Sequence, residues 1–273
     1  MDNLVVHSDA HVHLAQVAAI DPDFLSGLVG EDWLVASVSH DPTERDSEDG
    51  FIGLLSGGFR GFGIHPQDIR EDTMAYLADL AASRKIDFIG EAGFDFYGDR
   101  PERLRTERNL EEQRTAFEFQ LGLAAKHGLP ILVHSRKGMD LLLSYKSRLA
   151  TLAAVIFHSW PGRIGEARAF LDAGIEAYFS FGTTLVRGSP HARESCSGLP
   201  ADRILAETDA PWQPLKGESR TPLEAISLVE SAIASIRNMG IDELQAALRA
   251  NFLRAFKPEA ALDGKQAERQ KRR

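Results

Sequence analysis

The sequence contains little cysteine and no long apolar run. Its single cysteine, Cys196, excludes an internal disulfide and is typical of proteins in a reducing compartment. No stretch approaches the roughly 18 consecutive apolar residues that a transmembrane helix needs. The first apolar run is broken by His7 and Ser8 and follows no basic cluster, so no secretory signal is predicted. We therefore expect a cytoplasmic protein without a membrane segment, and we take it to be a monomer.

An excess of positive charge is also absent. A net charge of −9 for the whole chain, with +4 on its last ten residues (GKQAERQKRR), leaves −13 on the rest. Such a body does not offer the broad phosphate-binding surface that drives non-specific duplex binding, so no stable duplex binding is expected. A small or single-stranded nucleic-acid substrate held by a metal is compatible with this charge. Residues 261–273 are interpreted as a basic, solvated tail.

Short apolar runs alternate with longer segments of helical periodicity. The runs that predict strands cover residues 4–8, 33–38, 58–64, 86–90, 130–134, 153–157, 175–181 and 203–208. The segments that predict helices include 74–84, 111–127, 223–238 and 242–256, with Gly128 as a candidate C-cap. Eight strands separated by helices predict a parallel sheet, and eight is the number that closes an α/β barrel. The predicted fold class is therefore α/β, a (β/α)8 TIM barrel that occupies residues 1–260 as a single domain.

Histidines and carboxylates gather at the ends of these runs. They are His11 and His13 after the first run, His65 after the third, Glu91 after the fourth, His134 and His158 at the ends of the fifth and sixth, and Asp209 after the eighth. The carboxyl ends of all barrel strands face one mouth, where the active sites of this fold lie. Residues i and i+2 of an extended segment point the same way, so His11 and His13 can reach one ion together.

Four imidazoles and two carboxylates at one mouth predict a metal site. The set consists of His11, His13, Glu91, His134, His158 and Asp209. Imidazole favours zinc, whereas carboxylates and water favour magnesium or manganese, so the set is mixed. Six groups are too many for one tetrahedral ion and fit two divalent ions, Mg²⁺, Mn²⁺ or Zn²⁺, bridged by a carboxylate and a water. Any one of these histidines alone is more typical of a buried core residue, and the prediction depends on their convergence.

At these residues the chain resembles the TatD family of metal-dependent hydrolases, often described as deoxyribonucleases, within the amidohydrolase superfamily. The matching motifs occur in the order DAHVHL, GIHP, GEAGFDFY, QRTAFEFQLGLAAKHGLPILVHSR, VIFHSWPG, RILAETDAPW and NFLRAF. They extend from about residue 7 to residue 256. Two motifs depart from the family pattern. This chain has HSWPG where the family has HCFSG, and GFDFY where the family has GLDYY. Trp160 in the first of these is interpreted as a packing residue.

The resemblance implies roles for the candidate site residues. His11 and His13 would hold one ion with Asp209, Glu91 would bridge, and His134 and His158 would hold the second ion. Asp209 would also act as the catalytic general base toward the attacking water. His65 and Arg136 are substrate-binding candidates, with a turn role and a surface salt bridge as their alternatives. Asp95 either orients a histidine or caps a turn. The other histidines, His7, His40, His127 and His191, are interpreted as structural or exposed.

The implied activity is that of a metal-dependent hydrolase of ester bonds. The leading hypothesis is a phosphodiesterase, a 3'-5' exodeoxyribonuclease that acts on DNA through water activated by two metal ions. One alternative is another amidohydrolase-superfamily enzyme that hydrolyses a small amide, lactone or phosphoester. Many such enzymes have a bridging lysine at the end of strand four, where this chain has Glu91. The other alternative is a metal-binding module without catalysis, against which the complete ligand set argues.

Overall fold

The computed structural model describes residues 7–24, 28, 33–55, 57–98 and 100–257. Its centre is one eight-stranded parallel sheet in which each strand pairs with the next strand along the chain. The strands are β1 (Ser8–Val12), β2 (Leu34–Ser39), β3 (Gly57–Phe62), β4 (Phe88–Asp95), β5 (Ile131–Arg136), β6 (Val155–Phe157), β7 (Ala177–Phe181) and β8 (Ile204–Ala206).

The sheet curls until the segment that follows β8 meets β1. The backbone amide of Asp209 donates to the carbonyl of His11 at 2.9 Å, and that of His13 donates to the carbonyl of Ala210 at 2.9 Å. These bonds join the first and last strands at the carboxyl end of the barrel. The prediction of a (β/α)8 barrel is therefore confirmed.

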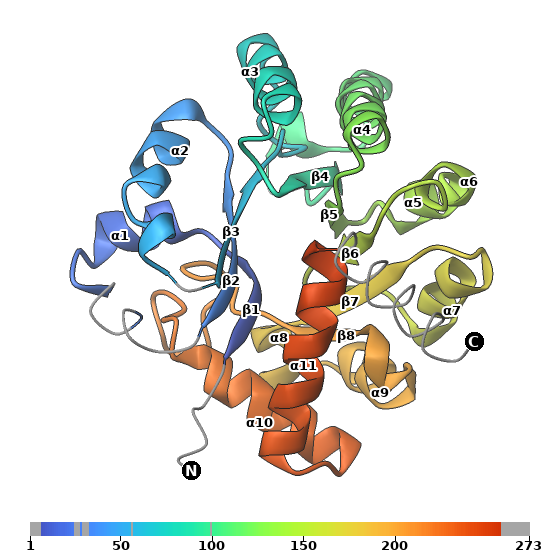
Figure 1. Ribbon diagram of the computed structural model, residues 1–273. Helices are drawn as coiled ribbons and strands as arrows, with labels where there is room; N and C mark the ends of the chain where they lie inside the picture. Colours follow the sequence, from blue (N-terminus) through green and yellow to red (C-terminus); the bar gives the residue numbers. More distant parts are fainter. Residues whose placement is uncertain (1–6, 25–27, 29–32, 56, 99, 258–273) are drawn as a thin grey trace, which may run out of the picture.

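Most helices surround the strands, and α11 (Ile241–Phe256) lies across one end of the barrel (Figure 1). The helices are α1 (Leu14–Ile20), α2 (Pro42–Asp49), α3 (Glu71–Ala82), α4 (Glu107–His127), α5 (Met139–Ser144), α6 (Lys146–Leu149), α7 (Ile164–Asp172), α8 (Thr183–Val186), α9 (Pro190–Gly198), α10 (Ala225–Arg237) and α11, with 3-10 turns at Ile52–Leu54, Pro101–Arg103 and Ala201–Arg203. The four helices predicted from periodicity are present. Gly128 has φ 67° and its amide bonds the carbonyl of Ala124, so the predicted C-cap is also confirmed.

The barrel interior is apolar below the mouth. Side chains from all eight strands pack there, and α11 adds Phe252, Ala255 and Phe256 from the amino-terminal end. Phe252 packs edge-on against Phe59 at 5.2 Å between ring centres, and Phe256 against Phe88 at 5.0 Å. In Figure 1, α11 crosses in front of the strands. Because α11 closes this end, access to polar groups inside the barrel is left to the carboxyl end.

The predicted position of the first strand is wrong. The apolar run placed it over residues 4–8, whereas β1 covers Ser8–Val12, and residues 1–6 lie outside the described residues. Asp9 is fully buried in this strand, where its carboxylate accepts hydrogen bonds from the amide and hydroxyl of Thr208 at 3.0 and 2.6 Å. Likewise β4 continues past residue 90 to Asp95. Polar residues that end an apolar run can continue a strand when the barrel interior supplies their partners.

Two further predictions concern packing and the tail. Trp160 is 2% exposed and its indole Nε1 donates to the hydroxyl of Ser195 at 3.1 Å, so its packing role is confirmed. The predicted tail, 261–273, lies outside the described residues.

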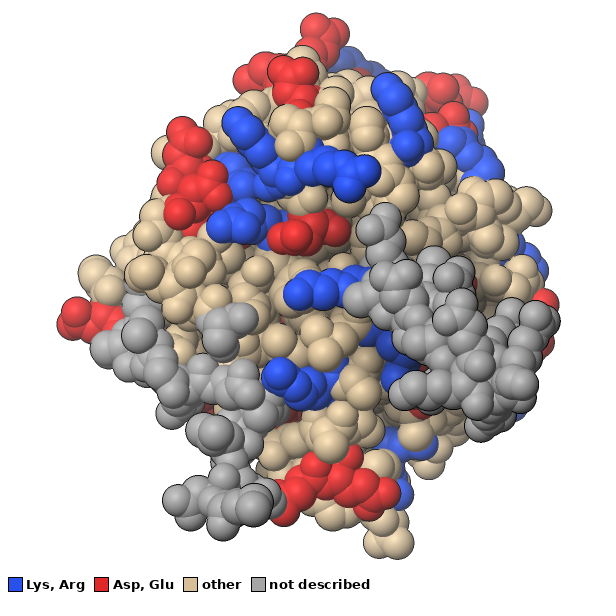
Figure 2. Space-filling view, viewed as in Figure 1, with Lys and Arg blue, Asp and Glu red and all other residues tan. Residues whose placement is uncertain are grey.

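The surface view in Figure 2 shows the face that α11 closes. Lysine and arginine side chains occur there together with acidic and uncharged ones. Among the residues that the structure describes, no helix has both the length and the apolar composition of a membrane span.

The close approach of β3 to β4 depends on a glycine. A Cβ at Gly63 would lie 2.3 Å from the carbonyl carbon of Gly90 and 2.7 Å from the amide nitrogen of Glu91. Backbone atoms cannot give way, so Gly63→Ala should lower the free energy of unfolding by about 1–3 kcal/mol, measured in urea. In the control Gly122→Ala, where the added Cβ meets nothing within 4 Å in α4, stability should rise by up to about 1 kcal/mol. Equal stability of the two variants would contradict this packing.

Candidate metal centre at the mouth of the barrel

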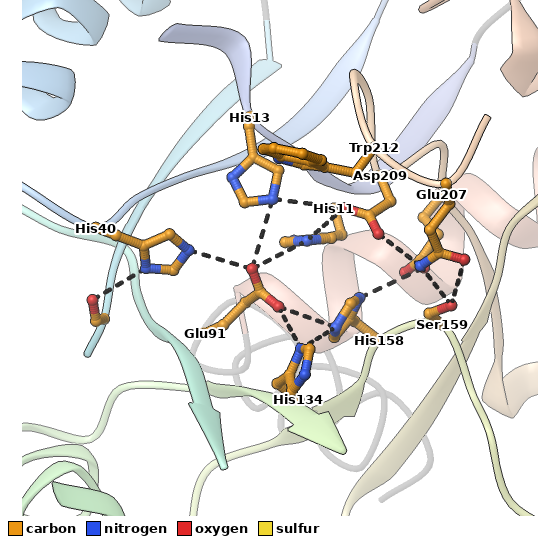
Figure 3. Close-up of polar contacts among 12 residues, drawn as sticks. His11, His13, His40, Glu91, His134, His158, Ser159, Glu207, Asp209 and Trp212 are labelled. Carbon is orange, nitrogen blue, oxygen red and sulfur yellow. Dashed lines mark hydrogen bonds and ion pairs between the residues drawn. The ribbon is translucent and has the colours of Figure 1, made fainter. Parts of the chain in front are cut away.

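Six side chains predicted from strand ends converge inside the carboxyl end of the barrel (Figure 3). His11 lies in β1, Glu91 in β4 and His134 in β5. His13 directly follows β1 and His158 directly follows β6. Asp209 lies three residues after the end of β8. All six are at least nine-tenths buried: His11, His13, Glu91, His134, His158 and Asp209. The structure therefore brings the six side chains together, as the order of the strands predicts.

Glu91 lies at the centre of this group. Its Oε1 is 3.4 Å from His11 Nε2 and 3.5 Å from His13 Nε2. Its Oε2 is 2.8 Å from His134 Nδ1 and 3.0 Å from His158 Nε2. Each carboxylate oxygen thus faces at least two imidazole nitrogens, which is the arrangement a carboxylate needs to lie between two cations.

Asp209 closes one side of the site. Its Oδ1 lies 3.3 Å from His11 Nε2 and 3.4 Å from His13 Nε2, and its Oδ2 accepts from Gln213 Nε2 at 2.5 Å. The residue has φ 58° in the turn that follows β8, and the amide of Trp212 bonds its carbonyl at 2.6 Å. The turn therefore holds the carboxylate toward the two histidines of β1.

Several buried nitrogen atoms here have no hydrogen-bond partner among the described residues. They are both ring nitrogens of His11, Nδ1 of His13 and Nδ1 of His158. A buried polar atom without a partner is costly, and one explanation is an ion that the atom ligates. Nitrogen or oxygen atoms of His11, His13 and Asp209, and of His11, Glu91 and His158, lie within 4.8 Å of one another. Both the residue types and their spacing fit divalent cations.

The ionisation of the site points the same way. Burial opposes the charge of Glu91, yet the neighbouring His11 and His158 outweigh it and hold the pKa of Glu91 well below its ordinary range. Burial also disfavours protonated His158, but the Glu91 carboxylate raises the pKa of His158 to about 9. Without metal, protonated imidazole thus balances the Glu91 carboxylate, and a divalent ion can take the place of the protons on the rings.

A carboxylate lies behind each of two histidines, and the one behind His134 is hydrogen-bonded to it. His134 presents Nδ1 to Glu91, and its Nε2 bonds Asp95 Oδ2 at 3.0 Å. His158 presents Nε2 to Glu91, and its Nδ1 lies 3.6 Å from Glu207 Oε1. A carboxylate on the far nitrogen sets the tautomer and the ring direction of a metal-binding histidine. The sequence left the role of Asp95 open, and the structure places it against His134.

Replacing Asp95 by asparagine should weaken metal binding. The amide can hydrogen-bond His134 only weakly and removes the buried negative charge that favours the Nε2–H tautomer. Metal affinity is expected to fall by about 10–100-fold, measured by titration calorimetry on metal-stripped protein. Unchanged affinity would show that His134 keeps its orientation without Asp95.

The two substrate-binding candidates lie at the edge of the centre. The ring of His65 lies 4.7 Å from that of His134, and its Nδ1 accepts from the amide of Gln67 at 3.1 Å. Burial lowers the pKa of His65 well below its ordinary value, so the ring is neutral at pH 7, and its proton is on Nε2 because Nδ1 accepts from Gln67. Arg136 lies 3.7 Å from Asp95 Oδ2 and stacks at 3.9 Å over the ring of Tyr97. Both candidates therefore lie beside His134 or its partner Asp95.

Two side chains in the centre were missed by sequence reasoning. His40, interpreted as structural or exposed, lies 3.2 Å from Glu91 Oε1 through its Nε2. The ring is only 15% exposed, so the exposed alternative is wrong, and the structure places the ring beside the centre. Glu207 is fully buried behind His158, and the sequence pattern predicts no role for it. A signal for His40 existed, since it directly follows the second strand and the rule applied to the other strand ends would have included it.

Comparison with known proteins identifies relatives. A family model described as TatD related DNase matches residues 8–257. A 3'-5' ssDNA/RNA exonuclease TatD from Erwinia amylovora is 32% identical over 203 residues, which cover 70% of this chain and 76% of the relative. The metal-dependent hydrolase YabD of Bacillus subtilis is 28% identical over 207 residues, or 73% of this chain and 77% of the relative.

Solved structures match the fold. YjjV, a TatD homologue from Escherichia coli, superposes with a TM-score of 0.77 at 23% identity and covers 92% of this chain and 97% of its own. A TatD family hydrolase from Entamoeba histolytica has a TM-score of 0.74 at 17% identity, with 92% of this chain and 98% of its own covered. At these identities the structures support the barrel architecture.

Proposed function

This chain belongs to the TatD-related DNase family of metal-dependent hydrolases, and we propose that it is a 3'-5' exonuclease that hydrolyses phosphodiester bonds in single-stranded DNA. One observation carries the proposal: a buried ring of histidines and carboxylates around Glu91 at the open end of the barrel. Relatives named as 3'-5' ssDNA/RNA exonucleases support the bond type and the polarity.

We assign the ligands to two divalent ions. His11, His13 and Asp209 would hold the first ion, His134 and His158 would hold the second, and the Glu91 carboxylate would serve both. The two pairs of imidazoles on opposite oxygens of Glu91 support this division. When bound, such ions neutralise phosphate charge and lower the pKa of a bound water. The majority of imidazoles favours Zn²⁺, and the two carboxylates also suit Mn²⁺ or Mg²⁺.

Asp209 acts as the general base in this proposal. Its pKa lies well below the ordinary value because the nearby His11 and His13 outweigh the effect of burial, so the carboxylate is ionised at neutral pH. It is 6% exposed, at the mouth where water enters. Gln213 donates to Oδ2 and is itself held by Ser159 at 2.9 Å. A carboxylate fixed in this way can accept a proton from the water that attacks phosphorus.

Groups at the rim fit a single-stranded substrate. Neutral His65 can donate to a phosphate oxygen, and Arg136 can pair with a phosphate. Trp212 is 55% exposed three residues beyond Asp209, and Tyr97 is 46% exposed beneath Arg136. Exposed aromatic faces bind unpaired bases by stacking, which a duplex does not offer. The net charge of −9 likewise favours a short local contact over a long phosphate-binding surface.

Hydrolysis of labelled oligonucleotides tests the proposal. Metal-stripped protein is incubated with single-stranded DNA labelled at the 5' end, with Mg²⁺, Mn²⁺, Co²⁺ or Zn²⁺ added in turn. We expect a metal-dependent ladder of stepwise shorter labelled products, because removal from the 3' end leaves the 5' label on the shortened strand. A 3'-labelled strand should release labelled mononucleotide at once. A blunt duplex of the same sequence serves as the control and should be cut much more slowly.

Two outcomes would contradict this function. Release of mononucleotide first from the 5' label would reverse the polarity. Absence of cleavage with every ion, in protein that binds metal, would exclude the nuclease and direct the search to small phosphoesters, amides and lactones.

A further inference from the structure

His40 reaches the metal centre from a strand that supplies none of the six assigned ligands. It lies directly between the end of β2 and Asp41, the N-cap of α2. Its Nε2 lies 3.2 Å from Glu91 Oε1, the same oxygen that faces His11 and His13. Figure 3 shows the ring approaching Glu91 from the side opposite His158.

The hydrogen bond at Nδ1 of His40 determines which ring nitrogen has a lone pair available to ligate a metal ion. Its Nδ1 lies 3.1 Å from the carbonyl oxygen of Gly63. Because a carbonyl only accepts, Nδ1 carries the proton, and in the neutral ring Nε2 then has a lone pair. That lone pair faces a carboxylate oxygen 3.2 Å away, so either a second proton on the ring or a metal ion can join the two groups. Metal-binding histidines commonly bond a backbone carbonyl through one nitrogen and the metal through the other.

The surrounding structure holds the ring in this position. The amide of His40 donates to Glu44 Oε2 at 2.9 Å, and the other oxygen of Glu44 accepts from Gln16 at 2.7 Å. The carbonyl oxygen that accepts from His40 Nδ1 belongs to Gly63. The amide of Gly63 donates to the carbonyl of Ser39, and its Cα packs directly against the backbone of Gly90 and Glu91. The ring and the carboxylate are thus fixed by the same contact between strands.

We propose that His40 is a further ligand of the metal centre, on an ion shared with His13 and Glu91. Nitrogen or oxygen atoms of His13, His40 and Glu91 all lie within 4.8 Å of one another. Ligand atoms about 2.0–2.2 Å from a zinc ion lie at most about 4.4 Å apart, so a small adjustment brings the three onto one ion. The inference rests on the proposed two-ion site, and it adds a third imidazole to one ion alone. The two ions then have unequal affinities.

Calorimetric titration of metal-stripped full-length protein with Mn²⁺ tests this assignment. His13→Gln and His158→Gln first identify which binding step belongs to which ion. His40→Gln should then weaken the His13-dependent step by at least about tenfold and leave the His158-dependent step unchanged. The visible absorption of bound Co²⁺ should also change in His40→Gln, because an imidazole nitrogen has left the ion.

The choice of glutamine separates a ligand from a hydrogen-bond donor. A glutamine amide can still donate to Glu91, so a histidine that merely donated would be replaced without loss of affinity. His191→Gln, at an exposed position of α9, controls for removing a histidine elsewhere, and His40→Asn is the second variant should glutamine disturb folding. Wild-type affinity in both steps for the His40 variants would overturn the inference and leave the two-ion site standing. Absence of metal binding by the unsubstituted protein would overturn both.

Discussion

Asp209→Asn is expected to reduce the rate of single-strand hydrolysis by about 10²–10⁴-fold while most metal stays bound. The asparagine has the same shape and retains one oxygen for the ion or for Gln213, but it cannot take a proton from water. His11 and His13, at 3.3 and 3.4 Å from the present carboxylate, remain to hold the ion. Turnover is measured under saturating Mn²⁺, and bound metal is measured by elemental analysis of the same samples.

Asp140→Asn is the matched control for this substitution. Asp140 lies in α5, and its exposed carboxylate pairs with Arg105. Its substitution should leave turnover and metal content unchanged. A full rate in Asp209→Asn would reject the general-base role. Loss of metal in proportion to loss of rate would instead assign Asp209 mainly to metal binding.

Glu91→Gln is expected to abolish the stabilisation of the fold by metal. An ion present at about 100 times its dissociation constant stabilises a folded protein by about 2.7 kcal/mol, or roughly 5–10 °C in Tm for a chain of this size. Glu91 faces both pairs of imidazoles, so its loss removes the negative charge that the two proposed ions would share. The measurement is the difference in Tm with and without Mn²⁺, which separates metal binding from any change in the stability of the metal-stripped protein.

Glu112→Gln provides the control for the loss of a glutamate. Glu112 is half exposed on α4 and pairs with Arg108, where single surface pairs contribute little to stability. Its Tm should rise on adding Mn²⁺ as much as that of the unsubstituted protein. A full metal-induced rise in Glu91→Gln would show that the ions do not share this carboxylate.

Much of the site could be predicted because barrel topology converts position along the chain into position in space. His134, His158 and Asp209 each lie at the end of an apolar run, and such ends meet at one mouth whatever their separation in sequence. The i, i+2 spacing of His11 and His13 likewise places both rings on the same side of the chain. The placement of Trp160 in the core was correct for a simpler reason, since a large apolar ring is stabilised by burial.

Errors arose where polar residues are buried. The first strand was placed too early because Asp9 and His11 interrupt the apolar run, although both are fully buried within β1. The sequence pattern leaves His40 as structural or exposed, although it follows β2 and its ring lies beside Glu91. Glu207, one residue after β8, likewise received no attention although it is fully buried.

The sequence alone therefore determined the strand count, the barrel and the six central groups, since these depend on periodicity and chain order. Only the tertiary structure decided which oxygen of Glu91 faces which imidazoles, that Asp95 lies behind His134, and that His40 enters the centre. Those contacts depend on how β3 and β4 approach at Gly63 and on how the turn after β8 directs Asp209. Distances of about 3 Å between residues far apart in the chain are set by packing, which local patterns do not encode.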